Sequence, residues 1–300
     1  MIAGGIDLGG TKIEAQIFDA DWSIVDRQRV VTPTTYPDLI AAVAGLIGWL
    51  DAQCPALPIG IAAAGVINPA NGLALTANLP ANAKPLPDDI MAAAGRQVVY
   101  INDCNAMALS ETVFGAAKGF DPVACLILGT GIGGGVVRGG RLFEGATGLG
   151  GEFGHFPLAA GPVVAHGLPV IRCGCGKMGC TETLLSGPGL SRIARHITGQ
   201  NLPATQIVAR RASEPDMAKS WDIWCELMAN MIMTLSFTVD PACIVLGGGL
   251  SGAPGLIADL QAALHRLQWP GFALPVLHLA QGGETSGARG AAYAAFVQGK

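Results

Sequence analysis

Two segments of this 300-residue chain, one near its start and one near its middle, share a pattern of strand, glycine turn and strand. In the first, Asp7-Leu8-Gly9-Gly10-Thr11 lies between apolar residues 2–6 and the alternating residues 12–18; in the second, the glycine loop 129–135 follows the apolar residues 123–128. A strand after the glycines argues against dinucleotide and P-loop motifs, which need a helix there. The repeat predicts two similar α/β lobes that offer backbone N–H groups to an anion between them.

Each glycine loop taken alone is also compatible with a simple tight turn. A third glycine run, Gly247-Gly248-Gly249, follows the apolar residues 243–246 and favours the anion-binding interpretation of all three. For Gly247 to Gly249 themselves, close packing is an equally good explanation.

Polar side chains also follow a predicted strand in the first half of the chain. Residues 97–101 read as a strand, Asn102 and Asp103 come next, and residues 106–114 read as a helix. Ligands of open α/β sheets bind at the carboxyl ends of strands, so Asp103 is a candidate catalytic base. Its alternative role is to cap the helix that follows. A helix over 38–53 and a strand over 59–63 complete the expected first lobe.

Three cysteines within eight residues, Cys173, Cys175 and Cys180, predict a metal site. His155 lies eighteen residues upstream of the first and would complete a tetrahedral zinc site, although His166 is a rival fourth ligand that spacing does not exclude. Disulfides are the weaker alternative, because no leader segment opens the chain. The other five cysteines read as buried thiols. Glu152 and Glu182 flank the metal motif, so a structural metal would hold two acids in place.

Composition narrows the expected partners. Charged residues make up 13% of the chain, against about 25% in average proteins, so we expect self-association, for which the resemblance described below implies a homodimer. A net charge of −4 with dispersed Lys and Arg argues against nucleic acid. The most apolar long stretch, residues 221–239, is interrupted by polar side chains and predicts a buried helix rather than a membrane span. We therefore expect a cytoplasmic protein.

Taken in order along the chain, these motifs resemble the ROK family of sugar kinases and repressors. The resemblance rests on Asp7 to Lys12, Asn102-Asp103, Gly129-Thr130-Gly131, Glu152-Phe153-Gly154-His155, the cysteine run closing on Glu182, and Gly247 to Gly249. The segments 76–80, 84–86 and 187–189 look most like the N-acetylglucosamine kinase branch. Thr183 follows Glu182 where Asn is expected in that branch, which leaves glucose, fructose and N-acetylmannosamine open as substrates.

The resemblance implies an α/β fold of the two-lobed actin-like ATPase type, as in sugar kinases, HSP70 and actin, with a structural zinc site. We expect an N-terminal lobe over 1–118, a C-terminal lobe over 119–287, and a last helix, about 288–300, that packs back onto the first lobe. The implied activity is ATP- and Mg²⁺-dependent phosphorylation of a hexose 6-hydroxyl, with N-acetylglucosamine as the first choice of substrate. ATP and sugar would meet between the lobes.

The resemblance also assigns roles to single residues. Asp103 would accept the proton of the sugar hydroxyl. Asp7 would organise Mg²⁺ through water, although it could instead close the turn. The nucleotide would be bound by Gly9, Gly10, Thr11, Lys12, Gly129, Thr130 and Gly131, with Gly247, Gly248 and Gly249 near the adenosine. The sugar would contact Gly65, Asn78, Asn102, Asp103, Glu152, His155 and Glu182, with His155 also binding zinc beside Cys173, Cys175 and Cys180.

Two other functions remain. A sugar-responsive repressor would need a DNA-binding domain before the first glycine loop, and only six residues precede Asp7, so we expect none. A catalytically silent sugar sensor would not need Asp103 or both loops. Turnover of ATP distinguishes the sensor from a kinase.

Overall fold

The computed structural model describes residues 1–76 and 78–299. Ala77, part of the segment 76–80, and Lys300, the last residue of the predicted C-terminal helix, lie outside the described residues. The chain forms two compact units. The first comprises residues 1–118, 135–150 and the segment from 281 onward; the second comprises 119–134 and 151–280.

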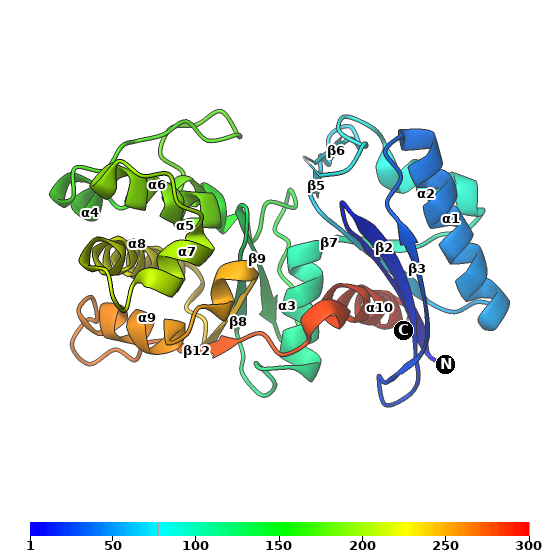
Figure 1. Cartoon of the computed structure of the whole chain (residues 1–300). Helices are drawn as coiled ribbons and strands as arrows, with labels where there is room; N and C mark the ends of the chain where they lie inside the picture. The colour runs from blue at the N-terminus through cyan, green and yellow to red at the C-terminus, as the bar shows by residue number, and fades with distance from the viewer. Residues whose placement is uncertain (77, 300) are drawn as a thin grey trace. The chain divides into compact units, whose positions relative to one another are not determined.

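A five-stranded sheet forms the centre of the first unit (Figure 1). Its order is β3 (Ile24–Val31), β2 (Lys12–Phe18), β1 (Ala3–Leu8), β4 (Ile59–Ala63) and β7 (Val99–Asn102). β1, β2 and β3 pair antiparallel, whereas β4 and β7 run parallel to β1. The strand after the first glycine turn is therefore a hairpin arm, as predicted. A separate two-stranded hairpin joins β5 (Val66–Ile67) and β6 (Ala74–Leu75).

Helices cover both faces of this sheet (Figure 1). α1 (Tyr36–Gln53) and α2 (Leu86–Ala94) pack on one face, where Leu39, Val43, Ile47 and Leu50 enter the main hydrophobic core. α10 (Ser286–Gln298) lies on the other face against β1 and β4, and it also packs along α3 (Asp103–Phe114). The last helix of the chain therefore contacts the strands at its beginning.

The contact of α10 with its neighbours is a backbone contact, because glycines lie where the elements meet. A Cβ at Gly5 of β1, Gly60 of β4 or Gly290 of α10 would overlap the carbonyl oxygen of Ala288, Ala291 or Ala106, respectively. The buried carboxylate of Glu111 accepts hydrogen bonds from the backbone N–H groups of Gln281 and Gly282, just before α10 begins.

The second sheet repeats the order of the first. It runs β10 (Arg141–Leu142), β9 (Ile132–Arg138), β8 (Val123–Leu128), β11 (Cys243–Gly247) and β12 (Val276–Leu279), with β11 parallel to both β8 and β12. In each sheet two strands joined by a glycine turn are followed by two parallel strands. This repeat confirms the predicted duplicated α/β fold.

Six helices belong to the second unit: α4 (Ala160–Ala165), α5 (Glu182–Leu185), α6 (Gly187–Thr198), α7 (Ala204–Arg210), α8 (Pro215–Val239) and α9 (Leu256–His265). α8 contains the apolar stretch 221–239 and is a buried helix, as predicted. Within residues 1–76 and 78–299, no helix combines the length and apolar character that crossing a membrane requires.

Two helices begin earlier than the sequence predicted, because side chains cap them. α1 begins at Tyr36 rather than at residue 38, since the Thr35 hydroxyl accepts the Asp38 N–H. α3 begins at Asp103 rather than at residue 106, because the Asn102 side chain accepts the N–H groups of Cys104 and Asn105. The helix cap is thus Asn102, and the prediction that Asp103 could fill this role is wrong.

Candidate functional site

Asn102 and Asp103 lie at the junction of β7 and α3. The side-chain oxygen Oδ1 of Asn102 caps α3 by accepting the Cys104 N–H. The side-chain nitrogen Nδ2 of Asn102 donates to the Gly65 carbonyl oxygen at 2.9 Å. The Cys104 N–H donates to Asp103 Oδ1 at 2.9 Å. Burial raises the pKa of the Asp103 carboxyl, while this N–H opposes the rise. The site therefore contains a half-buried carboxylate whose proton affinity is above normal.

A second half-buried carboxylate, Asp7, lies near the end of β1. Burial raises its pKa from 3.8 to about 6, the charges of Asp103 and Glu14 add to the rise, and Lys12 opposes it. Its carboxyl group lies against Gly287, near the start of α10, where a Cβ would come within 2.8 Å of it. Asp7 and Asp103 are thus close enough to interact electrostatically within the first unit.

The Asp7 carboxyl group should make the stability of the protein depend on pH when no Mg²⁺ is bound. Below about pH 4, Asp7 is protonated in both the folded and the unfolded state; between about 4 and 6 only the folded state keeps the proton. The free energy of unfolding contributed by Asp7 therefore falls as pH rises through this range. Asp7→Asn should match the wild type near pH 4 and exceed it above pH 6 by about 3 kcal/mol. Urea unfolding of both proteins from pH 4 to 8 measures this difference; a difference independent of pH would contradict it.

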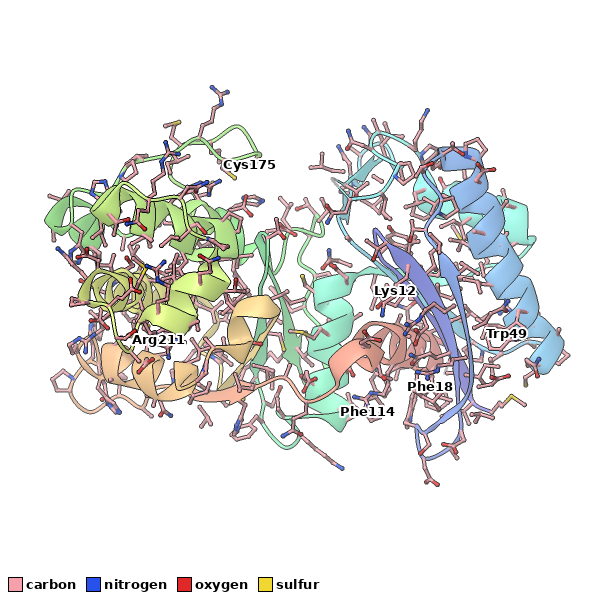
Figure 2. The ribbon with its side chains drawn as sticks, viewed as in Figure 1. Lys12, Phe18, Trp49, Phe114, Cys175 and Arg211 are labelled. Atoms are coloured by element: carbon pink, nitrogen blue, oxygen red, sulfur yellow. The ribbon has the colours of Figure 1, made fainter. Side chains whose placement is uncertain are left out.

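The first glycine turn joins β1 to β2. The Gly9 N–H donates to the Lys12 carbonyl oxygen at 3.1 Å and closes the turn. Gly10 lies against Asn78, because a Cβ there would come within 2.8 Å of the Asn78 carbonyl oxygen. The Thr11 carbonyl accepts the N–H of Thr32. Lys12, labelled in Figure 2, forms an ion pair with Glu284 at 2.9 Å.

The second glycine turn joins β8 to β9 and borders a cavity of about 510 Å³. The cavity is lined by Leu128, Gly129, Thr130, Gly187, Pro188, Ala204, Thr205, Val208, Gly249, Leu250, Gly252 and Ala253. Of the third glycine run, Gly249 lines the cavity. Gly247 ends β11, and Gly248, with φ +84°, packs against the backbone of Leu128. The contributions of Ala204, Thr205 and Val208 were missed, because small and apolar residues on a short helix carry no sequence signal.

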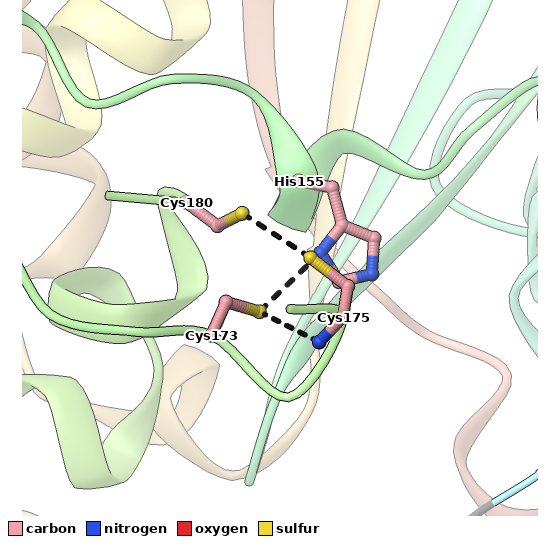
Figure 3. A group of neighbouring side chains, drawn as sticks. All are labelled: His155, Cys173, Cys175 and Cys180. Carbon is pink, nitrogen blue, oxygen red and sulfur yellow. Dashed lines mark hydrogen bonds between the residues drawn. The ribbon is translucent and has the colours of Figure 1, made fainter. Parts of the chain in front are cut away.

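His155, Cys173, Cys175 and Cys180 come together in the second unit (Figure 3). Their ligand atoms all lie within 4.8 Å of one another; Cys173 Sγ is 3.7 Å from His155 Nδ1, and Cys175 Sγ is 3.6 Å from Cys180 Sγ. Ligands of a tetrahedral zinc with bonds of ~2.0–2.3 Å are separated by about this much. Three sulfurs and one imidazole nitrogen therefore fit Zn²⁺, and the Sγ separation excludes a Cys175–Cys180 disulfide in this structure.

The rival ligand His166 lies outside this group. Its Nε2 atom is 2.7 Å from Glu226 Oε2, and its carbonyl oxygen is 3.3 Å from the His196 ring. His166 is therefore engaged by α8, which sequence spacing could not indicate.

Two acids flank the cluster, as the sequence predicted. Glu152 Oε2 lies 3.7 Å from His155 Nε2, and Glu182 Oε1 lies 3.9 Å from His155 Nδ1. The Cys173 thiol also donates to Glu182 Oε1 at 2.8 Å. A metal held by the four ligands would thus fix the surroundings of both carboxylates.

Removing the metal should destabilise the protein. A ligand present at a thousand times its Kd stabilises the folded state by about 4 kcal/mol, so a chelator should lower the Tm by several degrees. Cys175→Ser should lower the Tm of the zinc-loaded protein similarly, whereas Cys54→Ser, outside the cluster, should not. Calorimetry with and without chelator measures the effect. A chelator-independent Tm would contradict a structural metal.

The duplicated sheets and the glycine turns place this protein in the class of actin-like ATPase folds, and its cysteine–histidine cluster fits a structural zinc. The chain belongs to the ROK family, whose model matches residues 3–297.

Individual relatives agree with this assignment. The chain is 39% identical to the N-acetylgalactosamine kinase AgaK of Shewanella sp. (strain ANA-3), covering 96% of this chain and 94% of that protein. It is 38% identical to the N-acetyl-D-glucosamine kinase of Pectobacterium atrosepticum, covering 96% and 97%. The crystal structure of the ROK hexokinase from Thermus thermophilus matches with a TM-score of 0.87 at 32% identity over 99% of both chains.

Proposed function

We propose that this protein is an ATP-dependent sugar kinase that phosphorylates the 6-hydroxyl of an N-acetylated hexosamine, with N-acetyl-D-glucosamine as the first substrate. The observation that carries the proposal is the half-buried Asp103 carboxylate at the end of β7, whose neighbour Asn102 caps α3. Relatives named as N-acetylglucosamine kinases support the choice of sugar.

Asp103 would act on the sugar hydroxyl. A carboxylate with a raised pKa is a stronger base, and its partial burial limits the access of competing water. The N–H of Cys104 holds one carboxylate oxygen and thereby fixes the orientation of the side chain. Phosphoryl transfer needs mainly such positioning, together with charge stabilisation of the phosphates.

The nucleotide phosphates would be bound by backbone N–H groups and the charge of Lys12. We assign the residues of the two turns to this role, namely Gly9, Gly10, Thr11, Lys12, Gly129, Thr130 and Gly131, and the cavity beside Gly249 to the adenosine. Mg²⁺, when bound, would neutralise phosphate charge. The raised pKa of Asp7 fits a carboxylate whose negative charge is poorly compensated and would be stabilised by a bound cation.

Sugar hydroxyls require donors and acceptors held in fixed positions. We assign this role to Asn102 and Asp103 with Gly65 and Asn78 in the first unit, and to Glu152, His155 and Glu182 in the second. The hydrogen bond between Asn102 and Gly65 and the cluster around His155 supply that fixation. Zinc would serve as a structural ion that orients His155.

The test is a coupled assay of ADP release across a panel of sugars. N-acetylglucosamine should give the highest kcat/KM, and N-acetylgalactosamine is the second candidate because the relative at 39% identity carries that name. Glucose, fructose and N-acetylmannosamine complete the panel. No ADP release with any hexose would reject kinase activity and leave the sugar sensor.

Two further properties belong to the proposal. None of the eight cysteines, all of which lie within the described residues, forms a disulfide, and together with the use of ATP this supports a cytoplasmic location. The low charged fraction of 13% supports a homodimer. Sedimentation equilibrium would detect the dimer, and a monomer at micromolar concentration would contradict it.

A further inference from the structure

The residues 180–187, here called the connector, link the cysteine–histidine cluster to the second glycine turn. At one end Cys180 belongs to the cluster. At the other end the Gly187 N–H donates to the Gly129 carbonyl oxygen at 2.8 Å. The connector therefore contacts both a metal site and a turn that borders the nucleotide cavity.

Glu182 bridges the same two features with its two carboxylate oxygens. Oε1 lies beside the cluster, 2.8 Å from Cys173 Sγ, whose thiol donates to it when no metal is bound. Oε2 lies against the turn, because a Cβ at Gly131 would come within 2.9 Å of it. The absence of a side chain at Gly131 is what allows the carboxylate to rest against the loop.

The connector is held firmly between these ends. Leu184 and Leu185 are completely buried, and the Trp224 indole of α8 donates to the Leu185 carbonyl oxygen at 2.9 Å. The Thr181 hydroxyl donates to the Phe153 carbonyl oxygen, two residues before His155. Because close-packed interiors transmit displacements rather than absorb them, a shift at the cluster should reach the turn.

We propose that Glu182 is a positioning residue for the second glycine turn, and that through it the cysteine–histidine cluster sets the affinity for the nucleotide. This rests on the proposed function, in which residues 129–131 bind nucleotide phosphates. The bound metal then supports both substrate sites: it fixes the acids near the sugar, and it fixes the turn near the phosphates.

The first experiment measures Mg·ADP binding by calorimetry in the absence of sugar, with the zinc-loaded protein. Glu182→Ala removes the side chain that supports the turn and should weaken ADP binding about tenfold. Glu182→Gln keeps the shape and should bind ADP within about twofold of the wild type. A role confined to sugar recognition would instead leave ADP affinity unchanged in both variants while both lose sugar affinity. Wild-type ADP affinity in Glu182→Ala therefore overturns the proposal.

The turn offers a reciprocal variant with a matched control. Gly131→Ala introduces a Cβ against Glu182 Oε2 and should also weaken ADP binding. Gly174→Ala makes the same change beside the cluster, where a Cβ would have no atom within 4 Å, and should bind ADP normally. Equal ADP affinity in the two variants would overturn the contact between Glu182 and the turn.

The wild-type protein provides a test that needs no variant. Coupling between two sites is reciprocal, so if zinc strengthens ADP binding, ADP must strengthen zinc binding by the same factor. We expect Mg·ADP to lower the fraction of Zn²⁺ that a chelator removes at equilibrium, whereas inorganic sulfate should not. Identical zinc affinity with and without ADP would overturn the proposal. Failure of the wild type to bind ADP at all would instead overturn the proposed function.

Discussion

Asp103→Asn is expected to fold like the wild type, to bind sugar, and to lose between about a hundredfold and ten-thousandfold in kcat. The amide cannot accept the proton of the sugar hydroxyl. It retains a side-chain oxygen that can accept the Cys104 N–H, and it places no charge in a half-buried position. Its Tm at pH 7 should therefore equal or exceed that of the wild type.

Asn102→Ala is the control for this variant, because Asn102 and not Asp103 caps α3. Losing the cap should cost about 1 kcal/mol of stability. The pair of variants thus separates the chemical step from folding and binding: Asp103→Asn should lose kcat with its stability intact, whereas Asn102→Ala should lose stability and sugar affinity. Steady-state ADP release and thermal unfolding measure both. Near-normal turnover of Asp103→Asn would remove Asp103 from its proposed catalytic role.

The position of Asp103 could be predicted, whereas the local structure around it could not. An apolar strand followed by polar residues is visible in the sequence, and it correctly placed Asn102 and Asp103 at the end of β7. The start of α3 was predicted three residues late, because the choice between Asn102 and Asp103 as the cap depends on which side chain turns back toward the helix.

The ligands of the metal site, too, could be predicted from the sequence only in part. The three cysteines were identifiable from their spacing, but the choice between His155 and His166 was not. It is decided by tertiary structure: Glu226, sixty residues beyond His166 in the sequence, pairs with that ring. Likewise, the glycine runs were visible, yet the contact of Glu182 with Gly131 depends on how the connector packs.

The largest loss of stability is expected from Gly290→Ala in α10. Alanine normally stabilises a helix relative to glycine by about 0.5–1 kcal/mol. At this position, however, the added Cβ would overlap the Ala106 carbonyl oxygen of α3, and that oxygen belongs to helical backbone that cannot rotate away. We expect a cost of about 3 kcal/mol or more, because α10 and α3 must separate.

Gly45→Ala in α1 is the matched control, since it makes the same change on an exposed part of a helix where a Cβ would meet nothing within 4 Å. It should stabilise the protein by about 0.5–1 kcal/mol. Denaturant unfolding of the two variants should therefore give changes of opposite sign. Because Ala106 lies three residues after Asp103 on α3, Gly290→Ala should also lower kcat in the fraction that remains folded. A stabilising effect of both substitutions would show that α10 does not rest on the backbone of α3.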